Sequence, residues 1–200
     1  MRSAIILVGG EARRAGGKEK YFFRYRGQTF IERLIGTLRD VVDEIVIVAK
    51  DPAQCERFSH IPGVVCVSDE RRGLGPIGGL HAGAQRAHGE YVFVAACDMP
   101  CISQPVIELL FSRAEGFDAA IPAHSEEMYE PLHAVYRLEA LRQYLERHEA
   151  LSLRAMVRAL RSRYVSIEEI RTIDPALLTF TNINKLEDLI RHEGMETGGH

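Results

Sequence analysis

The residues best suited to chemistry form a glycine-rich, basic loop near the amino terminus, at positions 9–20. Glycine allows tight turns and lets backbone N–H groups approach a ligand closely, and basic side chains attract negative charge. The loop contains four glycines and four basic residues: Gly9, Gly10, Gly16, Gly17, Arg13, Arg14, Lys18 and Lys20. This composition predicts an anion-binding loop with phosphate as its ligand. The alternative is a flexible, solvated connection that binds nothing.

The spacing within this loop excludes two common phosphate loops. A P-loop has Gly, four residues and then Gly-Lys-Ser/Thr, whereas Ala12 and Glu19 occupy the first and last of these positions. The dinucleotide fingerprint Gly-x-Gly-x-x-Gly is also missing. The loop follows an apolar run at 4–8, which predicts a buried strand, and ligands of open α/β sheets bind outside the carboxyl ends of strands. Its position therefore favours anion binding.

The carboxylate of Asp98 is a second candidate. Asp98 follows an apolar run at 91–97, which predicts a buried strand, and Pro100 cannot continue the strand ladder. The chain therefore has to turn and leave Asp98 at the carboxyl edge of the sheet. Mg²⁺ is usually held by one or two carboxylates together with substrate phosphates, so Asp98 is the predicted metal ligand. The alternative is a turn or cap residue ahead of the helix predicted at 105–114.

Asp69 and a second glycine-rich stretch form the third candidate. Asp69 follows an apolar run at 64–67, and the stretch at 73–84 contains Gly75 followed by Pro76, which suits the first turn of a helix. Small residues let this helix lie close to the sheet or to a ligand. Asp69 is expected to face the mouth of the sheet, although a single Asp also commonly bonds a turn.

The elements that position these residues alternate along the chain. Four apolar runs, at 4–8, 44–49, 64–67 and 91–97, predict buried strands. Thr29 and Glu32 form a capping box in front of a helix that extends to Val42. Strands separated by helical lengths indicate a parallel sheet with right-handed crossovers. The predicted fold is α/β, with a doubly wound, mostly parallel, Rossmann-like sheet in three layers.

The second half of the chain is less regular. Apolar spacing predicts strands at 118–122 and 131–136 and helices at 138–145 and 153–160. The polar segment at 124–130 suits an acceptor site. Arg154 and Arg158 are interpreted as solvated charge, with contact to an anionic acceptor as a weaker alternative. We expect a single domain over residues 1–192 and a frayed polar tail at 193–200.

Composition limits the classes of partner. The chain has 200 residues, 46% of them apolar, and its net charge of -3 with a pI near 6.2 disfavours nucleic acid. No apolar run reaches the ~20 residues that span a bilayer, so we expect no membrane partner and a cytoplasmic location. The cysteines are predicted to be buried, reduced thiols: Cys55, Cys66, Cys97 and Cys101. The histidines lack zinc-binding spacing.

A family resemblance appears in four segments that follow one another along the chain. The segments are Leu7-Val8-Gly9-Gly10-x-Ala12-Arg13-Arg14-x-Gly16-Gly17-x-Glu19-Lys20, Asp69 with Gly75-Pro76-Ile77-Gly78-Gly79, Cys97-Asp98-Met99-Pro100, and Asn182-x-Asn184. In this order they resemble the motifs of the molybdenum cofactor guanylyltransferases, a family of α/β nucleotidyltransferases. The chain differs from the usual pattern at Val8, Ala15 and Glu19, and at Lys185-Leu186 after the last segment.

This resemblance implies transfer of GMP from GTP to the terminal phosphate of molybdenum-bearing molybdopterin, with Mg²⁺ as cofactor and pyrophosphate as product. It implies catalytic roles for Lys20, Asp98 and Arg14, with Asp98 as the metal ligand. The nucleotide-binding residues that it implies are Leu7, Val8, Gly9, Gly10, Arg13, Lys20, Asp69, Gly75 and Asp98. Acceptor contacts are expected from His133, Asn182 and Asn184, although the two asparagines equally suit capping of a final helix.

Two other functions remain open. The chain could be a cytidylyltransferase or another nucleotidyltransferase that acts on a pterin, an isoprenoid phosphate or a sugar phosphate, because the loops of these enzymes are similar. It could also be a nucleotide-binding module without chemistry that serves as a partner of molybdenum enzymes or their assembly proteins. Lys20 and Asp98 weigh against this second alternative, since a binding module has little use for a metal carboxylate.

Overall fold

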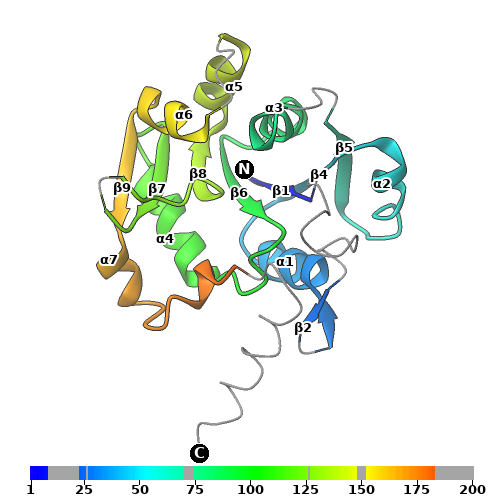
Figure 1. The fold of residues 1–200 in the computed structure, drawn as a ribbon, viewed down its shortest axis with the longest axis horizontal. Coiled ribbons are helices and arrows are strands. Elements are labelled where there is room, and N and C mark those ends of the chain that lie inside the picture. The colour runs from blue at the N-terminus through cyan, green and yellow to red at the C-terminus, as the bar shows by residue number, and fades with distance from the viewer. Residues whose placement is uncertain (9–22, 26, 70–73, 126, 148–151, 183–200) are drawn as a thin grey trace, which may run out of the picture.

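The computed structural model describes residues 1–8, 23–25, 27–69, 74–125, 127–147 and 152–182. A seven-stranded sheet crosses the molecule with helices on both faces (Figure 1). Its strands are β1 Arg2–Leu7, β4 Glu44–Ala49, β5 Val64–Ser68, β6 Tyr91–Ala96, β7 Ala119–Ala123, β8 His133–Arg137 and β9 Ser162–Ser166. The spatial order is β5-β4-β1-β6-β8-β7-β9, and of these strands only β8 is antiparallel to its neighbours. The predicted α/β fold with a mostly parallel sheet is confirmed.

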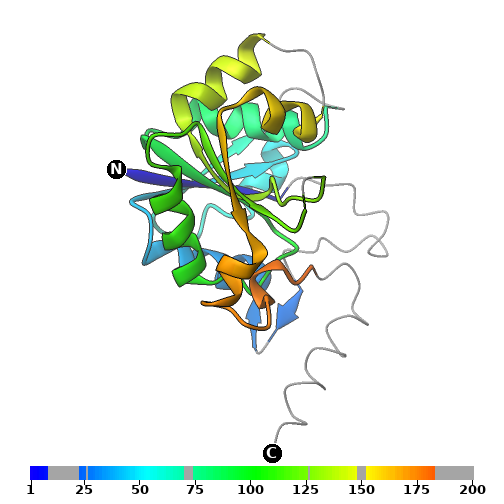
Figure 2. The same ribbon diagram turned by 90° about the vertical axis from the view of Figure 1, so that its left-hand side faces the viewer.

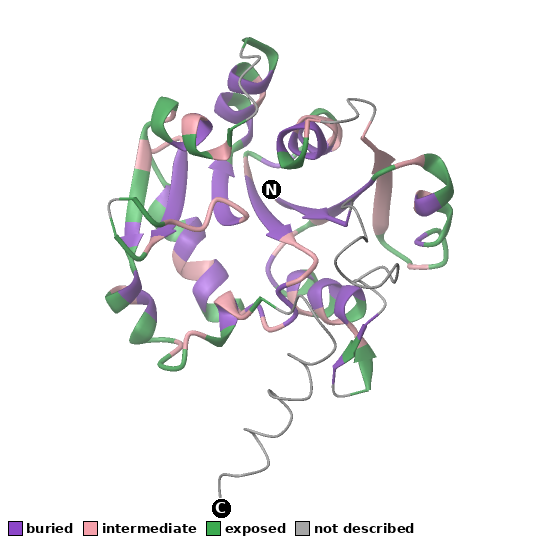
Figure 3. Cartoon of the chain, in the orientation of Figure 1, coloured by how far each residue is buried: buried purple, intermediate pink, exposed green. Residues whose placement is uncertain are grey.

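Two apolar cores on opposite faces of the sheet hold three layers together (Figure 2). The helices are α1 Phe30–Arg39, α2 Pro52–Glu56, α3 Pro76–Arg86, α4 Gln104–Ala114, α5 Leu138–Arg147, α6 Leu153–Ala159 and α7 Ile167–Arg171. Side chains alternate across a strand, so Ala4 and Ile6 of β1 pack with α1 and α4, whereas Ile5 and Leu7 pack with α3 and α5. Figure 3 shows that the central strands are buried between the two helical layers, whereas β5 is half-buried and β9 is mostly exposed.

The predicted capping box starts α1. The Thr29 hydroxyl accepts a hydrogen bond from the Glu32 N–H at 3.3 Å, and the Glu32 carboxylate accepts one from the Thr29 N–H at 2.7 Å. The helix ends at Arg39, three residues before the predicted end, because Asp40 is its C-cap and Val41 and Val42 form a turn. A two-stranded hairpin, β2 Arg24–Tyr25 and β3 Gln28–Thr29, precedes it.

Helix α3 lies against the sheet through two of its glycines. A Cβ atom on Gly79 would be 3.1 Å from Cδ2 of Leu7, and one on Gly83 would be 2.8 Å from Cγ2 of Ile5 and 3.0 Å from Cγ2 of Val48. Real Cβ atoms essentially never come as close as 2.8 Å, so a side chain at position 83 would force a shift, and one at position 79 would require Leu7 to move by a few tenths of an ångström. The predicted close packing of the helix is confirmed, and it fixes α3 over β1 and β4.

Gly83→Val is expected to destabilise the protein by about 2 to 3 kcal/mol, because the added side chain would overpack the buried Ile5 and Val48. The matched control is Gly36→Ala on the exposed face of α1, where a Cβ atom meets nothing within 4 Å. That change is expected to stabilise by about 0.5 to 1 kcal/mol through helix propensity. Urea unfolding of both variants measures the two effects. Equal stability of the two variants would contradict the packing argument.

Two sequence predictions outside the site are corrected. Cys55 of α2 and Cys66 of β5 form a disulfide with 5.6 Å between their Cα atoms, so the prediction that they are reduced thiols is wrong. Their pairing depends on α2 folding back against β5, which cysteine spacing does not reveal. Cys97 and Cys101 form no disulfide, as the prediction of reduced thiols requires, and they are half-buried. Strand β9 was not predicted, because Val165 alone of its residues is buried. Among the described residues, no helix combines the length and apolar character needed to cross a bilayer.

Candidate active site

The carboxyl edge of the parallel strands β5, β4, β1 and β6 brings the described candidates together. The Cys97 N–H donates to the Leu7 carbonyl at 3.2 Å, which places Asp98 beside the end of β1. The Asp69 N–H donates to the Ala49 carbonyl at 2.8 Å, which places Asp69 beside the end of β4. Three strand spacings of about 4.8 Å separate the ends of β5 and β6, so the backbone positions that carry Asp69 and Asp98 are roughly 14 Å apart along this edge. An extended ligand is needed to reach both.

Leu7 and Val8 lie between these two carboxylates. Their side chains are buried in opposite apolar cores. The Leu7 carbonyl accepts from Cys97, and the Val8 N–H donates to the Val48 carbonyl at 3.0 Å. The Leu7 carbonyl and the Val8 N–H therefore already have hydrogen-bond partners within the sheet. The predicted backbone contacts of Leu7 and Val8 to a nucleotide would have to use other backbone atoms.

Asp98 lies in a turn that the surrounding structure holds in place. The Met99 N–H donates to the Ala96 carbonyl at 3.4 Å, the Met99 side chain is buried, and Arg33 Nε donates to the Pro100 carbonyl at 3.4 Å. Asp98 is half-buried, and its Oδ1 is shielded from solvent. The N-cap of α4 is Ser103, so Asp98 does not cap that helix. The helix-cap alternative for Asp98 is therefore excluded, and the turn-residue alternative remains beside the metal-ligand role.

The chemistry of the available donors fits Mg²⁺. Among the described residues, no group of three or more His, Cys, Asp or Glu side chains converges on one point. A cation bound by protein side chains alone would need such a group. Mg²⁺ instead keeps waters and accepts phosphate oxygens beside one or two carboxylates, which a single Asp98 at the ligand-binding edge can supply.

The amino terminus of α3 supplies a complementary feature at the same edge. Its N-cap, Gly75, has φ 59° and ψ -145°, a conformation that favours glycine, and no side chain caps the helix. Pro76 occupies the first turn, as predicted. Because the helix follows β5, its first N–H groups face the edge that carries Asp69. The positive end of the helix dipole favours an anion there.

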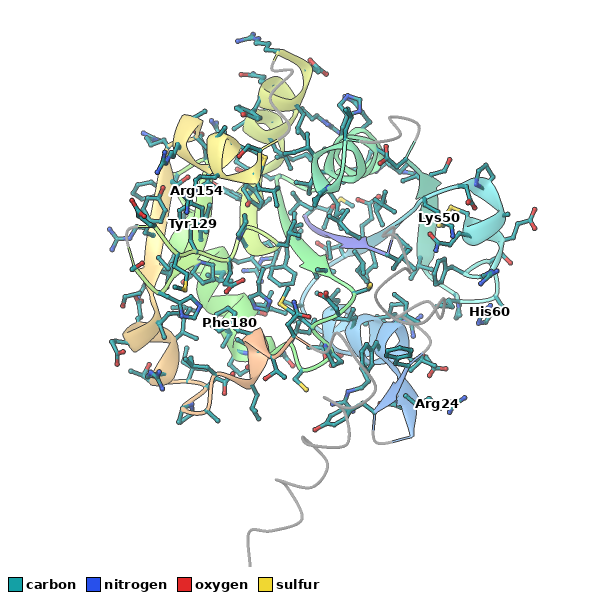
Figure 4. All side chains as sticks on the ribbon, viewed as in Figure 1. Arg24, Lys50, His60, Tyr129, Arg154 and Phe180 are labelled. Carbon is teal, nitrogen blue, oxygen red and sulfur yellow. A yellow bond between two sulfur atoms is a disulfide. The ribbon has the colours of Figure 1, made fainter. Side chains whose placement is uncertain are left out.

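Lys50 is a candidate that the sequence reasoning missed. It follows β4 directly and is exposed between the ends of β1 and β5 (Figure 4). Its N–H donates to Gln54 Oε1 at 2.8 Å, and Asp51 next to it caps α2, so the backbone at this point is fixed. The sequence pattern that selected Asp98 also applies to Lys50, because each is the first polar residue after an apolar run.

Several predicted site residues lie outside the described part of the chain. These are Gly9, Gly10, Arg13, Arg14, Lys20 and Asn184. Their roles remain predictions. The chain enters that first segment from Val8, at the edge that carries Asp98 and Asp69.

The acceptor candidates fall on the other half of the same edge. Strand β8 is antiparallel to β6, so its first residue, His133, lies opposite Ala95 near the Asp98 turn. The His133 side chain is fully buried, and its ring packs edge-to-face on Phe93 and Phe180 at 5.1 and 5.0 Å. The ring is therefore not presented to a ligand in this structure. Asn182, by contrast, is exposed.

Two neighbouring segments complete this half. His124 Nε2 and Glu130 Oε1, at the ends of the polar segment 124–130, are 3.2 Å apart. Arg154, at the start of α6, donates to the Glu127 carbonyl at 2.8 Å and lies 6.0 Å from the ring centre of Tyr129 (Figure 4). Arg154 thus contacts the segment predicted to carry an acceptor site, whereas Arg158 is exposed on α6.

The burial of His133 predicts a pH-dependent stability. Burial lowers the pKa of His133 from 6.5 to about 3, so the folded ring stays neutral where the unfolded ring binds a proton. Stability should therefore fall as the pH drops from about 6.5 toward 3, by about 1.4 kcal/mol per pH unit. Between pH 7 and pH 5, wild type should lose about 2 kcal/mol more than His133→Leu in urea unfolding. A variant of exposed His60 should follow wild type, and identical losses in wild type and His133→Leu would contradict the prediction.

Known proteins resemble this chain in sequence and in fold. A family model described as the MobA-like NTP transferase domain matches residues 4–165. The chain is 40% identical over 198 residues to a probable molybdenum cofactor guanylyltransferase from Methanosarcina acetivorans, covering 94% of this chain and 88% of the relative. It is 37% identical over 201 residues to the molybdenum cofactor guanylyltransferase of Desulfosudis oleivorans, covering 98% and 96%. The crystal structure of molybdopterin-guanine dinucleotide biosynthesis protein A from Archaeoglobus fulgidus matches with a TM-score of 0.82 and 33% identity, covering 100% of both chains.

Proposed function

Because the chain belongs to the MobA-like NTP transferase family, we propose that it transfers GMP from GTP to the terminal phosphate of molybdopterin and releases pyrophosphate. It is a nucleotidyltransferase by this membership. The observation that carries the specific proposal is the position of Asp98 beside the end of β1, on the edge that also holds Asp69 and the start of α3. Both the transferred nucleotide and its leaving group need charge neutralisation at one place, and Mg²⁺ held by Asp98 together with the first N–H groups of α3 would supply it at this edge.

The reaction needs no covalent catalyst from the protein. An oxygen of the acceptor's terminal phosphate attacks the α-phosphorus of GTP, a new P–O bond forms, and the bond from the α-phosphorus to the bridging oxygen of the β-phosphate breaks. The electron pair of that bond leaves with pyrophosphate. The protein's contribution is to align the two anions and to neutralise the charge that develops. Lys20 and Arg14 are proposed to supply positive charge, with Arg13 and the amides of Gly9 and Gly10 holding phosphate.

The described residues are assigned complementary tasks in this proposal. Asp98 would hold Mg²⁺, which when bound neutralises phosphate oxygens and orients them. The first N–H groups of α3, which Gly75 leaves uncapped by a side chain, favour an anion at the same edge. Asp69 and the backbone of Leu7 and Val8 would contact the nucleoside. Lys50, which follows β4 at the same edge, is proposed to add positive charge there.

The acceptor is assigned to the second half of the edge. Asn182 and Asn184 carry amides that both donate and accept, as recognition of a pterin edge requires. Asn182 is exposed near the Asp98 side of the sheet, in the segment that follows Thr179. Molybdenum enzyme assembly proteins are the proposed protein partners, since a finished cofactor has to be handed on.

The test combines nucleotide choice with turnover. In calorimetry with Mg²⁺, GTP should bind at least ~10-fold more tightly than CTP or ATP, a preference of about 1.4 kcal/mol or more. When purified molybdopterin is added, the protein should release pyrophosphate from GTP but not from CTP or ATP. A preference for CTP would move the assignment to a cytidylyltransferase. Tight GTP binding without pyrophosphate release would favour the non-catalytic partner.

A further inference from the structure

One threonine in the described chain joins three separate segments through hydrogen bonds. Thr179 is fully buried, and its Oγ1 is 3.1 Å from Nε2 of the equally buried His133. The same Oγ1 accepts a hydrogen bond from the Ser103 N–H at 3.1 Å. The Thr179 N–H donates to Oδ2 of Asp174 at 2.8 Å. The Thr179 hydroxyl therefore connects the segment around Thr179 to Ser103 and to His133 by hydrogen bonds, in addition to packing in the core.

Both partners of the Thr179 hydroxyl flank the proposed metal ligand. Ser103 ends the loop that begins at Cys97 and carries Asp98, and it is the N-cap of α4. His133 begins β8 and pairs with Ala95 of β6, the strand that leads into Asp98. The segment around Thr179 is therefore attached to the Asp98 loop on one side and to the neighbouring strand on the other.

The next residue extends this attachment to the polar segment at 124–130. The Phe180 ring packs on His133 at 5.0 Å and on His124 at 5.7 Å between ring centres (Figure 4). The short helix Leu178–Phe180 begins after Leu177, whose φ of 52° is unfavourable for a side chain of this kind. Contacts on both sides have to offset this cost, which indicates that the segment is held in one defined position.

We propose that Thr179 is a positioning residue for the acceptor, acting through the segment 174–182. Its hydroxyl holds this segment against the Asp98 loop and so fixes Asn182, three residues later and exposed, relative to the metal ligand. The inference rests on the proposed function. A purely packing role does not require the hydroxyl, because valine has nearly the same shape and no polar group to bury. The hydrogen bonds to Ser103 and His133 do require it.

Three variants separate positioning from packing. Thr179→Val removes the hydroxyl and keeps the branched shape, and Thr179→Ser keeps the hydroxyl. Thr172→Val is the control, since the Thr172 hydroxyl bonds only the Glu169 carbonyl beside it in α7 and is exposed. In Thr179→Val, the KM for molybdopterin should rise at least about tenfold, the usual consequence of losing a buried hydrogen bond that positions a ligand group. The Kd of GTP with Mg²⁺ should change less than about twofold, and Thr179→Ser and Thr172→Val should resemble wild type.

Amide hydrogen exchange provides a readout that does not depend on turnover. The amides of Ser103, Phe180 and Thr181 should exchange faster in Thr179→Val than in wild type, with the control unchanged. Unchanged exchange would overturn the inference whatever the activity. If wild type is active and Thr179→Val has the same KM for molybdopterin, the inference is also overturned. The same holds if the substitution weakens the binding of molybdopterin and of GTP equally. A wild type that transfers no GMP to molybdopterin would instead overturn the proposed function, and with it the acceptor role of this segment.

Discussion

Asp98→Asn is expected to lower GMP transfer at least ~100-fold while the protein keeps nearly its wild-type melting temperature. Asparagine has the same size and can make similar hydrogen bonds, but it lacks the negative charge that Mg²⁺ requires. The N-cap position of α4 is Ser103 and not Asp98, so Asp98→Asn is expected to cause no loss of helix capping. The half-buried position of Asp98 at the ligand-binding edge supports the metal role.

The measurement for Asp98 is pyrophosphate release across a Mg²⁺ titration, beside a thermal melt of the same sample. Asp40→Asn is the matched control, since Asp40 is exposed at the far end of α1 and has no proposed ligand. Normal activity of Asp98→Asn at ordinary Mg²⁺ concentration would remove the proposed metal site. A large fall in melting temperature would instead point to a structural role in the turn.

Lys20→Ala should reduce turnover by ~10²-fold or more, because its ammonium is expected to touch phosphate oxygens whose charge grows during transfer. Lys20 lies outside the described residues, so this expectation rests on the loop motif and on the position of that loop after β1. Folding should survive. Lys18→Ala removes one positive charge from the same loop at a position that the resembling motif, Gly16-Gly17-x-Glu19-Lys20, leaves unspecified, so as the control it should lower turnover much less. If Lys20→Ala keeps a near-normal kcat, the loop is a solvated connection.

Strands β1, β4, β5 and β6 were predictable because each contains an apolar run of four residues or more. Residues 44–49 coincide with β4, and 91–97 exceeds β6 by one residue. Burial on both faces leaves no room for polar side chains, so the sequence pattern and the structure agree. The polar residues that end these strands, Asp69 and Asp98, were predictable for the same reason. Lys50 meets this criterion too and was missed only because no motif accompanies it.

The second half was less predictable because its interactions connect distant positions. Strand β9 has one buried residue, Val165, so it leaves no apolar run to detect. His133 was expected to meet the acceptor, yet the structure buries its ring against Phe93 and Phe180. The hydrogen bond between His133 and Thr179 joins residues 46 positions apart, and no local pattern encodes it. The same limitation applies to the Cys55–Cys66 disulfide.

The reversed direction of β8 has an evolutionary consequence. Because β8 runs against β6 and β7, the connection from β7 into β8 and the segment after α7 both emerge at the edge used by the parallel strands. The β7–β8 connection and the segment after α7 contain no residue of β5, β4 or β1. Insertions and substitutions in these two segments therefore leave intact the strands that carry the nucleotide candidates. Under the proposed function, the acceptor site can therefore change by remodelling these two connections while the strands that carry the nucleotide candidates stay the same. A chimera that exchanges only residues 124–132 and 174–182 between relatives would change acceptor preference and keep nucleotide preference.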